Sequence, residues 1–443
     1  MIRIYLTPYS TGSDIPQFLG FADTMLRHGL KFYEYASTSS SINERWPYPW
    51  PYIYGPIWAI ILSFLRYYLA PRAYVYSYWI GQVYYVKVSI DWIIVVKSIL
   101  IIADVINFIL IYLISRKLTD NKKYWILAPS IYFLHPMVIY ITGIYGMFDQ
   151  LALSPFLFSI YIVLCSRGNS DKMFASGIFT GLSILIKHVI LAPLPLIAIY
   201  IAKHYSIKKS LAWFLGIVIS VLAVFTPFLA SIEGNINEIL KLFTYPLSTY
   251  YVEPICYSFN GLSSLISYLY KHYGIELGYL LKLWWIPFTS LLSFLVILSI
   301  KRHIDLIYLI TVAYTISITT YWRINHQYFV ALIAFLSLTS TYFLEKEKLC
   351  ETKLSRIHLL NTLNIALIAI IGFWVFMYPI SFWFHVHIEN PNWKLIEIIN
   401  RFSLMVFEEK YYVIYSLVLT LTEYFYIFLS LLLYRILHNF FFP

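Results

Sequence analysis

The first residue whose type and setting could do chemistry is Asp14. It lies near the start of the chain, ahead of a proline- and aromatic-rich run at residues 46–52 (WPYPWPY). Because only 12% of the residues are charged, a carboxylate on a long non-helical loop at a membrane surface is a candidate catalytic group. The alternative is structural, since an Asp directly before Ile15 and Pro16 commonly caps a short helix that starts there.

A second group of charged residues falls inside apolar segments. Lys97 and Asp104 are seven residues apart, two turns along one helix face. Charges within a membrane must face protein or water, so an ion pair or a buried network that fixes packing is the first interpretation of this pair. Lys187 and His188 coincide instead with an expected helix break, where a cation can hold an anion such as a phosphate.

Arg323 and His326 fall in a short polar segment that follows Tyr321 and Trp322. An arginine is a natural partner for a lipid-linked phosphate, although interfacial anchoring is a competing explanation for Arg323. The carboxylates are too dispersed to indicate a metal site, and the three cysteines are too widely spaced for a disulfide framework. The motifs GxxxxGK[ST], HExxH, CxxC and GxSxG do not occur, so nucleotide hydrolysis and the common hydrolase mechanisms lack their parts.

The composition places these residues in a membrane protein. Of the 443 residues 60% are hydrophobic, and the mean hydropathy is +0.70, well above the values of soluble domains. The net charge of +10 would suggest nucleic acid in a soluble protein. Here the Lys and Arg residues lie in short loops between apolar runs, as orientation by inside positive charge requires. We therefore expect an all-α polytopic membrane protein that contacts membrane lipid and no nucleic acid.

The apolar runs predict about 11 membrane helices. They cover residues 90–114, 124–141, 151–165, two legs within 175–201, 211–230, 280–300, 306–321, 328–344, 357–380 and 411–434. Every strongly basic loop lies on one side only if residues 52–70 form an interfacial helix rather than a span. Asp14, Asp149, Arg323 and His326 then share the external side, and this convergence favours a site there.

The same topology divides the chain into four parts. Residues 1–89 form an external loop with interfacial helices, residues 90–230 a transmembrane module, residues 231–279 a second external loop, and residues 280–443 a C-terminal transmembrane module.

Several stretches, taken in order, resemble the GT-C superfamily of polyprenyl-phosphate-sugar-dependent glycosyltransferases, particularly the dolichyl-phosphate-glucose and -mannose enzymes of asparagine-linked glycan assembly. The similar stretches are Ser13-Asp14, residues 46–52, 97–105 (KSILIIADV), 135–136 (HP), 145–150 (YGMFDQ), 181–193, 257–260 (YSFN) and 325–330 (NHQYFV). Two features depart from the family. In the family a spanning helix precedes the Asp loop, and this chain starts too late to contain one. The family's Tyr-Pro-Pro motif is replaced here by a Pro/aromatic repeat.

The resemblance implies a GT-C-like bundle that moves a hexose from a polyprenyl-phosphate-linked donor to a lipid-linked glycan or related acceptor, with no further cofactor. Asp14 would be the base of an inverting single displacement, and Asp149 would orient the acceptor or assist the base. The donor phosphate would be held by Lys187, His188, Arg323 and His326. The active site would face the lumenal or extracytoplasmic side, and low Gly with abundant Ile and Tyr hints at a thermophilic archaeal source.

Two other classes of function remain open. A transporter or flippase of lipid-linked sugars would also have a helix break and intramembrane charges, but it would be favoured by internal inverted repeats, and none is convincing here. A non-catalytic subunit of a glycan assembly complex predicts that Asp14 can be replaced freely.

Overall fold

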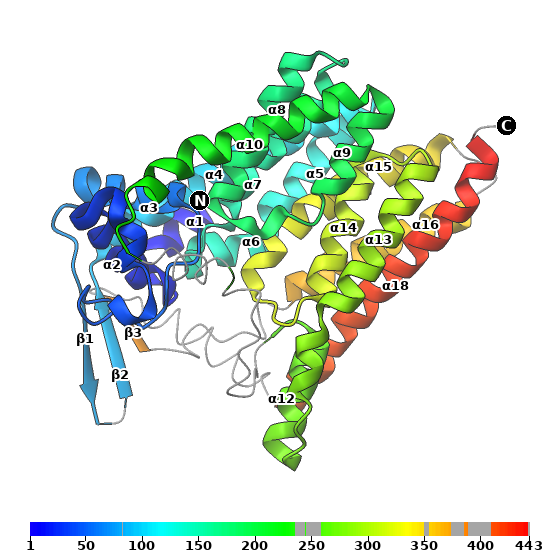
Figure 1. Ribbon diagram of the computed structural model, residues 1–443. Coiled ribbons are helices and arrows are strands. Elements are labelled where there is room, and N and C mark those ends of the chain that lie inside the picture. The colour runs from blue at the N-terminus through cyan, green and yellow to red at the C-terminus, as the bar shows by residue number, and fades with distance from the viewer. Residues whose placement is uncertain are drawn as a thin grey trace.

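The computed structural model describes residues 1–81, 83–234, 244, 258–349, 354–373, 385–388 and 409–441 (Figure 1). Part of the predicted external loop at 231–279, including Tyr257 of the YSFN motif, lies outside these residues, as do residues 374–384 and 389–408 of the predicted C-terminal module. The described chain is mostly helical. Its α-helices are α1 (Ile2–Leu6), α2 (Asp14–His28), α3 (Pro56–Phe64), α4 (Ile90–Leu118), α5 (Lys122–Leu134), α6 (Pro136–Ile139), α7 (Asp149–Cys165), α8 (Ser170–Ile186), α9 (Leu194–His204), α10 (Ile207–Ala230), α12 (Gly261–Tyr273), α13 (Trp285–Lys301), α14 (Leu306–Thr320), α15 (Phe329–Leu349), α16 (Leu354–Phe373) and α18 (Glu409–Phe441).

Several of these helices are suited to a membrane. Within the described residues, five helical segments are long and apolar enough to cross one, at Ile90–Leu118, Ile207–Ala230, Gly278–Lys301, His326–Lys346 and Lys410–Leu432. A sixth is added if α5 and the bent segment Pro136–Tyr145, which meet at 50°, count as one span. Shorter apolar helices accompany them at Pro56–Leu69, Asp149–Cys165, Leu194–His204, Leu306–Thr320 and Ile357–Phe373. The prediction of a helical membrane protein is confirmed at this level.

The apolar helices differ in how far the protein itself covers them. The His326–Lys346 segment, which contains α15, has 83% of its apolar window buried, so it lies at the centre of the bundle. The window of α10 is 22% buried, and that of the segment containing α13 is 11% buried. A helix that exposes apolar side chains on most of its surface needs an apolar solvent, and α10 and α13 therefore have the surfaces of lipid-facing helices.

The expected break within residues 175–201 is confirmed. Helix α8 ends at Ile186, a short 3-10 turn η6 covers His188–Ile190, and α9 begins at Leu194. Pro193 stands at the N-cap position of α9 with Pro195 inside its first turn, where the missing N–H costs no hydrogen bond. Lys187 is thus an extended residue between two helices.

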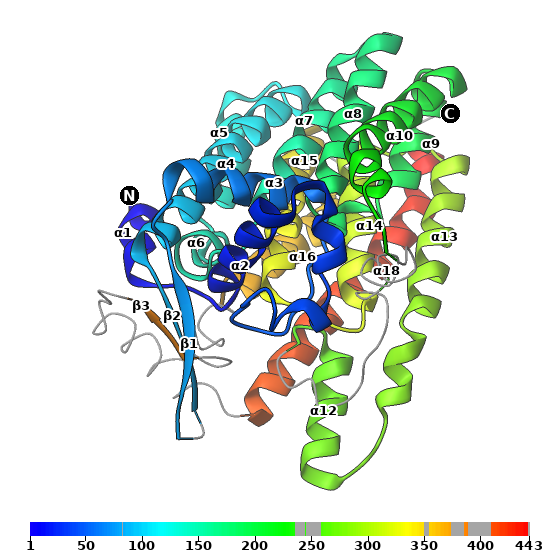
Figure 2. The same ribbon diagram turned by 60° about the vertical axis from the view of Figure 1, so that its left-hand side comes forward.

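A three-stranded sheet departs from the all-α prediction. Strands β1 (Val75–Ile80) and β2 (Val83–Val88) form an antiparallel hairpin, and β3 (His385–Ile388) pairs in parallel with β2. The runs VYSYWI and VYYVKV consist largely of β-branched and aromatic residues around Gly81, a pattern typical of a hairpin. Figures 1 and 2 show β1 and β2 projecting from the same end of the bundle as α12.

The helix expected over residues 52–70 is present as α3, which continues into a π-helical turn η4 (Leu65–Leu69). Its interfacial placement stays a prediction.

Candidate functional site at one end of the bundle

Asp14 is the first residue of α2, with Ser13 at the N-cap position. The expectation of a long non-helical loop is therefore wrong at this point, and the alternative of a helix start is right within one residue. Pro16 in the first turn favours a helix start here. Asp14 is half-buried between Ser13 and Ile15, which are both buried.

The surroundings of Asp14 change its basicity. Burial raises the pKa of this carboxyl above its ordinary value, and the negative charge of Asp149 raises it further. A hydrogen bond from the Tyr145 hydroxyl and the positive charge of Lys187 act in the opposite direction. Asp14, Tyr145, Asp149 and Lys187, which come from three separate parts of the chain, are therefore neighbours.

Lys187 and Asp149 form a buried ion pair. The Lys187 Nζ lies 2.7 Å from Asp149 Oδ2, and the two residues are 2% and 5% exposed. The same ammonium lies 5.1 Å from the ring centroid of Phe148, 5.2 Å from that of Tyr328 and 5.8 Å from that of Tyr54. Asp149 thus neutralises the cation that the sequence suggested for a phosphate, within a wall of aromatic rings.

The second oxygen of Asp149 is a further feature of this pair. Its Oδ1 is buried and has no hydrogen-bond partner among the described residues. A buried carboxylate oxygen without a donor is costly, so this oxygen is a candidate acceptor for a hydroxyl of a bound molecule.

The other three phosphate candidates differ in their setting. His326, in the 3-10 turn η9 (His326–Tyr328), is buried with its ring edge-on to Tyr145 at 4.5 Å between centroids. Arg323 is exposed three residues earlier. His188 is half-buried, and burial together with the charge of Lys187 lowers its pKa to about 4. His188 is therefore neutral near pH 7 and brings no positive charge to the site.

Tyr48, in the proline-rich run, and Tyr54, shortly after it, are also close enough to Asp14 for its charge to affect them. Burial raises the pKa of both Tyr48 and Tyr54, and the negative charge of Asp14 raises each of them further. The run at residues 46–52 and the segment after it are therefore next to the start of α2.

Lys97 fastens the segment before Asp14 to the turn before Tyr145. Its Nζ donates to the backbone carbonyls of Ser10, Gly143 and Ile144, the last two at 2.9 and 2.8 Å. Lys97 is fully buried. The ammonium therefore positions two parts of the site by satisfying carbonyls rather than by pairing with an anion.

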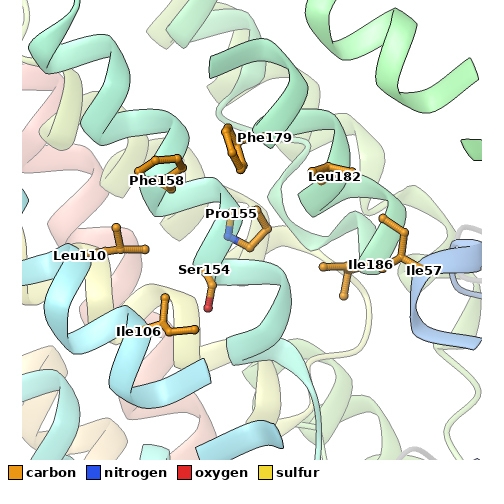
Figure 3. Close-up of a pocket in the computed structure, with 9 residues that line it drawn as sticks. All are labelled: Ile57, Ile106, Leu110, Ser154, Pro155, Phe158, Phe179, Leu182 and Ile186. Carbon is orange, nitrogen blue, oxygen red and sulfur yellow. The ribbon is translucent and has the colours of Figure 1, made fainter. Parts of the chain in front are cut away.

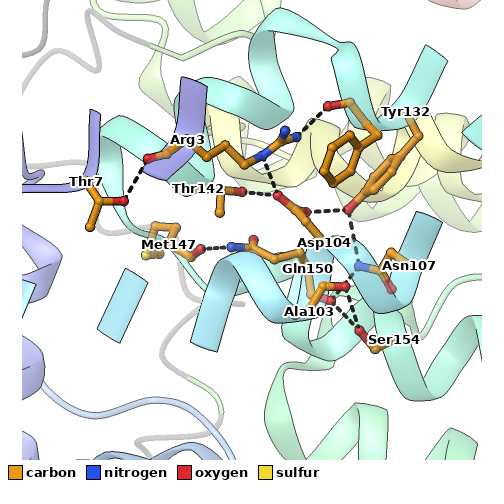
Figure 4. Close-up of polar contacts among 11 residues, drawn as sticks. Arg3, Thr7, Ala103, Asp104, Asn107, Tyr132, Thr142, Met147, Gln150 and Ser154 are labelled. Carbon is orange, nitrogen blue, oxygen red and sulfur yellow. Dashed lines mark hydrogen bonds and ion pairs between the residues drawn. The ribbon is translucent and has the colours of Figure 1, made fainter. Parts of the chain in front are cut away.

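Asp104 belongs to a separate network, shown in Figure 4. It accepts hydrogen bonds from Arg3 Nε at 2.9 Å, from the Thr142 hydroxyl at 2.6 Å and from the Tyr132 hydroxyl at 2.9 Å. Its ion pair is with Arg3, not with Lys97. Figure 4 also shows the network continuing through Asn107 to Gln150, the residue after Asp149.

Two glycines allow close contact between the Asp14 segment and the Tyr145 turn. Gly12 N–H donates to the Tyr145 carbonyl at 2.8 Å, and a Cβ on Gly12 would lie 2.6 Å from the Tyr145 ring. Gly146 has φ +89°, and a Cβ there would lie 2.2 Å from Ile15 Cδ1. Only a residue without a side chain can occupy these positions without moving the neighbours.

Figure 3 shows an apolar cavity, whose volume is about 540 Å³. Its lining residues are Ile57, Ile106, Leu110, Ser154, Pro155, Phe158, Phe179, Leu182 and Ile186. Ile186 directly precedes Lys187, and Ile57 directly precedes Trp58, whose ring stacks on Phe148 at 4.5 Å. One end of the cavity is therefore close to the ion pair.

Sequence reasoning missed Arg3 and Tyr145. Arg3 is a charge in the apolar stretch at residues 2–6, which was a signal for a buried partner. Tyr145 opens the YGMFDQ stretch that already pointed to Asp149. Its role could not be read from spacing, because its partner Asp14 is far away in the chain.

No protein-family model matches the chain, and no curated protein sequence matches it. Among the described residues there is no group of three or more His, Cys, Asp or Glu side chains that could hold a metal ion.

Proposed function

We propose that the chain is a GT-C-type membrane glycosyltransferase that moves a hexose from a polyprenyl-phosphate-linked donor to a glycan acceptor on the external face. The observation that carries the proposal is the Asp14 carboxyl, half-buried with a raised pKa, next to a buried polar cluster at the end of an apolar cavity. A carboxylate of raised pKa is a better base than an ordinary one, and the cavity suits a lipid chain.

The chemistry needs one base. The Asp14 carboxylate removes the proton of an acceptor hydroxyl while that oxygen forms a bond to C1 of the sugar. The bond from C1 to the phosphate oxygen breaks, and its electron pair leaves with the polyprenyl phosphate. Because the leaving group is already a stable phosphate anion, it needs little acid help, and a single displacement inverts the anomeric centre.

The residues around Asp14 take distinct parts in this proposal. The unpartnered Oδ1 of Asp149 accepts a hydrogen bond from a second hydroxyl of the acceptor and so orients it. Arg323 is exposed and meets the donor phosphate first. Lys187 contributes positive charge from within its pair with Asp149, and His326 packs edge-on against Tyr145.

The apolar cavity takes the first isoprene units of the donor. Its walls are almost entirely aliphatic and aromatic, and burial of an isoprenoid chain there is favourable by the hydrophobic effect. Because Ile186 and Lys187 are adjacent, a lipid in this cavity brings its phosphate toward the cluster.

The proposed topology has 11 spans. They are α4, the bent pair of α5 with the segment after it, α7, α8, α9, α10, α13, α14, α15, α16 and α18. Helix α3 lies at the interface in this arrangement, and the basic loops lie opposite the site.

The test compares the native chain with Asp14→Asn in lipid nanodiscs. Each is offered polyprenyl-phosphate-linked glucose and mannose with a lipid-linked oligosaccharide, and transfer of labelled sugar is measured. We expect Asp14→Asn to lower transfer by about 10²–10⁴-fold.

The matched control is Asp23→Asn. Asp23 is on the same helix but pairs with Arg66 at 2.7 Å, so its loss should leave transfer nearly unchanged. Transfer that survives in Asp14→Asn, or donor binding without transfer in the native chain, would contradict the proposed activity.

A further inference from the structure

Four aromatic residues form a row from the tip of the β1–β2 hairpin to the start of α2. Trp79 and Tyr84 have ring centroids 5.0 Å apart across the hairpin, Tyr84 and Tyr48 are 6.2 Å apart, and Tyr48 stacks on Trp50 at 4.5 Å. We call these four residues the aromatic row. Trp79 is 67% exposed and Tyr48 is buried, so the row leads from the surface toward the interior.

The inner part of the row is fixed by hydrogen bonds. The Tyr84 hydroxyl donates to the Pro47 carbonyl, which joins the hairpin to the proline-rich run. The Gln17 side chain accepts from Tyr48 N–H at 3.1 Å and donates to the Trp50 carbonyl at 3.0 Å. Gln17 thus holds both residues of the stacked pair.

Gln17 also connects the row to the candidate base. It lies three residues after Asp14 on α2, one turn along the same helix face. The charge of Asp14 in turn acts on Tyr48. The row therefore begins next to the carboxyl and ends at the hairpin tip.

The opposite face of the hairpin is also aromatic. Tyr74 and Tyr76 stack at 5.8 Å, Tyr76 and Tyr78 follow at 5.9 Å, and Tyr78 stacks on Tyr85 at 5.6 Å. Lys87 Nζ lies 5.8 Å from the Tyr76 ring. Since successive strand residues point to opposite faces, both faces of the hairpin present aromatic rings, several of them with hydroxyls.

This surface suits a ligand that has flat C–H faces and polar edges. A pyranose ring has both, because its C–H groups pack on the negative face of an aromatic ring while its hydroxyls meet polar groups at the edge. The ring separations of 4.5–6.2 Å along the row are close to the length of one sugar unit in a glycan chain. An aliphatic lipid chain would gain nothing from the tyrosine hydroxyls.

We propose that the aromatic row binds successive sugars of an oligosaccharide acceptor whose terminal hydroxyl reaches Asp14. Trp79, Tyr84 and Trp50, which are exposed or half-buried, carry the sugars, and buried Tyr48 supports the rings on either side of it. The inference that the ligand is the acceptor rests on the proposed function. The affinity of the row for an oligosaccharide does not.

The test compares native protein, Trp79→Ala and Trp79→Phe in nanodiscs. Mannohexaose and maltohexaose, with mannobiose and maltose as short counterparts, are used both in direct binding and as acceptors for transfer. We expect Trp79→Ala to weaken binding of the preferred hexasaccharide and raise its KM roughly tenfold, with kcat and the disaccharide values unchanged. Trp79→Phe, which keeps a ring, should fall between the two.

The control is Trp285→Ala, because Trp285 is a similarly exposed tryptophan, at 52%, on the distant helix α13. It should change no value. Equal loss for long and short sugars in Trp79→Ala would indicate a lipid anchor at the hairpin tip and overturn the proposal. So would failure of the native chain to prefer either hexasaccharide over its disaccharide. Length-dependent binding without transfer would retain the row and reject the glycosyltransferase.

Discussion

At the Asp14 carboxyl, protonation decides whether the group can act as a base. Its pKa is raised by burial and lowered again in part by the hydrogen bond from Tyr145. Activity should therefore be lost, as pH falls, at a higher pH than for an ordinary carboxyl. Tyr145→Phe removes a hydrogen bond that stabilises the charged form, so the pKa rises further and the acid limb of kcat/KM moves to higher pH.

The pH profile of kcat/KM for both chains checks this prediction. Tyr5→Phe is the control, because Tyr5 is 57% exposed and the aromatic contact described for it is a tilted one with Tyr9, at 5.7 Å between ring centroids. A Tyr145→Phe profile whose acid limb stays in place or moves to lower pH would contradict the assigned role of Tyr145.

The pair of Lys187 and Asp149 makes a second prediction at this scale. Breaking a buried pair leaves an uncompensated charge, so Asp149→Asn should destabilise the protein by about 3–5 kcal/mol. The double variant Asp149→Asn with Lys187→Gln removes both charges and should recover most of that loss. Thermal unfolding of the three chains in detergent measures this, and a single variant as stable as the native chain would show that the pair is not a buried ion pair.

The sequence could identify individual residues of the site, but it could not identify the residues that they pair with. Charges such as Lys97, Asp104 and Lys187 stand out because they are costly in apolar surroundings. Their pairing depends on tertiary contacts, which is why Asp104 pairs with Arg3 and Lys187 with Asp149. No local spacing could indicate either pair.

Among the elements, the turn between Tyr145 and Asp149 lies against the start of α2, and we expect it to position Asp14. Gly146 has φ +89° and faces Ile15, so Gly146→Ala adds both backbone strain and a clash with the residue after Asp14. We expect a stability loss of about 1–3 kcal/mol and a clear fall in kcat. Activity and unfolding temperature measure the two effects.

Gly274→Ala is the matched control, since Gly274 has φ +66° with nothing within 4 Å of an added Cβ. It should lose stability without losing kcat. Adding Ile15→Ala to Gly146→Ala removes the clashing side chain and should restore part of the activity. Equal kcat in both glycine variants would show that the turn does not position Asp14.

The elements themselves were predictable to different extents. Long apolar runs predicted α4, α10 and α18, because a helix that crosses a membrane needs a long run of apolar residues. The β1–β2 hairpin was not predicted, since residues 1–89 were assigned to an external loop with interfacial helices. The alternative of a helix capped by Asp14 and starting at Ile15 is one residue from the observed start of α2. The sequence left it open against a catalytic role, because Asp suits both a capping position and a catalytic one.

At the scale of the whole molecule, the helix ends sort into two groups. Asp14, the Tyr145 turn, Asp149 and the break at Lys187 meet at one end. At another part of the bundle, Lys203 Nζ donates to the carbonyls of Ser299, Ile300 and Arg302 at 2.8 Å each. The basic end of α9 is therefore in contact with the basic end of α13. This grouping agrees with the order of spans drawn from charge. In that order the basic loops join helix ends on one side of the membrane, and the other helix ends lie together on the opposite side.

Orientation in the membrane follows from this grouping and gives the last prediction. If the basic loops are cytoplasmic, Ser39, which precedes the proline-rich run, is external, and Asp120, between α4 and α5, is internal. Both residues are exposed, so each can be replaced by cysteine in a chain whose Cys165, Cys256 and Cys350 are changed to serine. In sealed right-side-out vesicles a membrane-impermeant thiol reagent should label Ser39→Cys at once and Asp120→Cys only after permeabilisation. The reverse pattern would place Asp14 on the cytoplasmic face, where the donor would have to be a lipid-linked sugar of the inner leaflet.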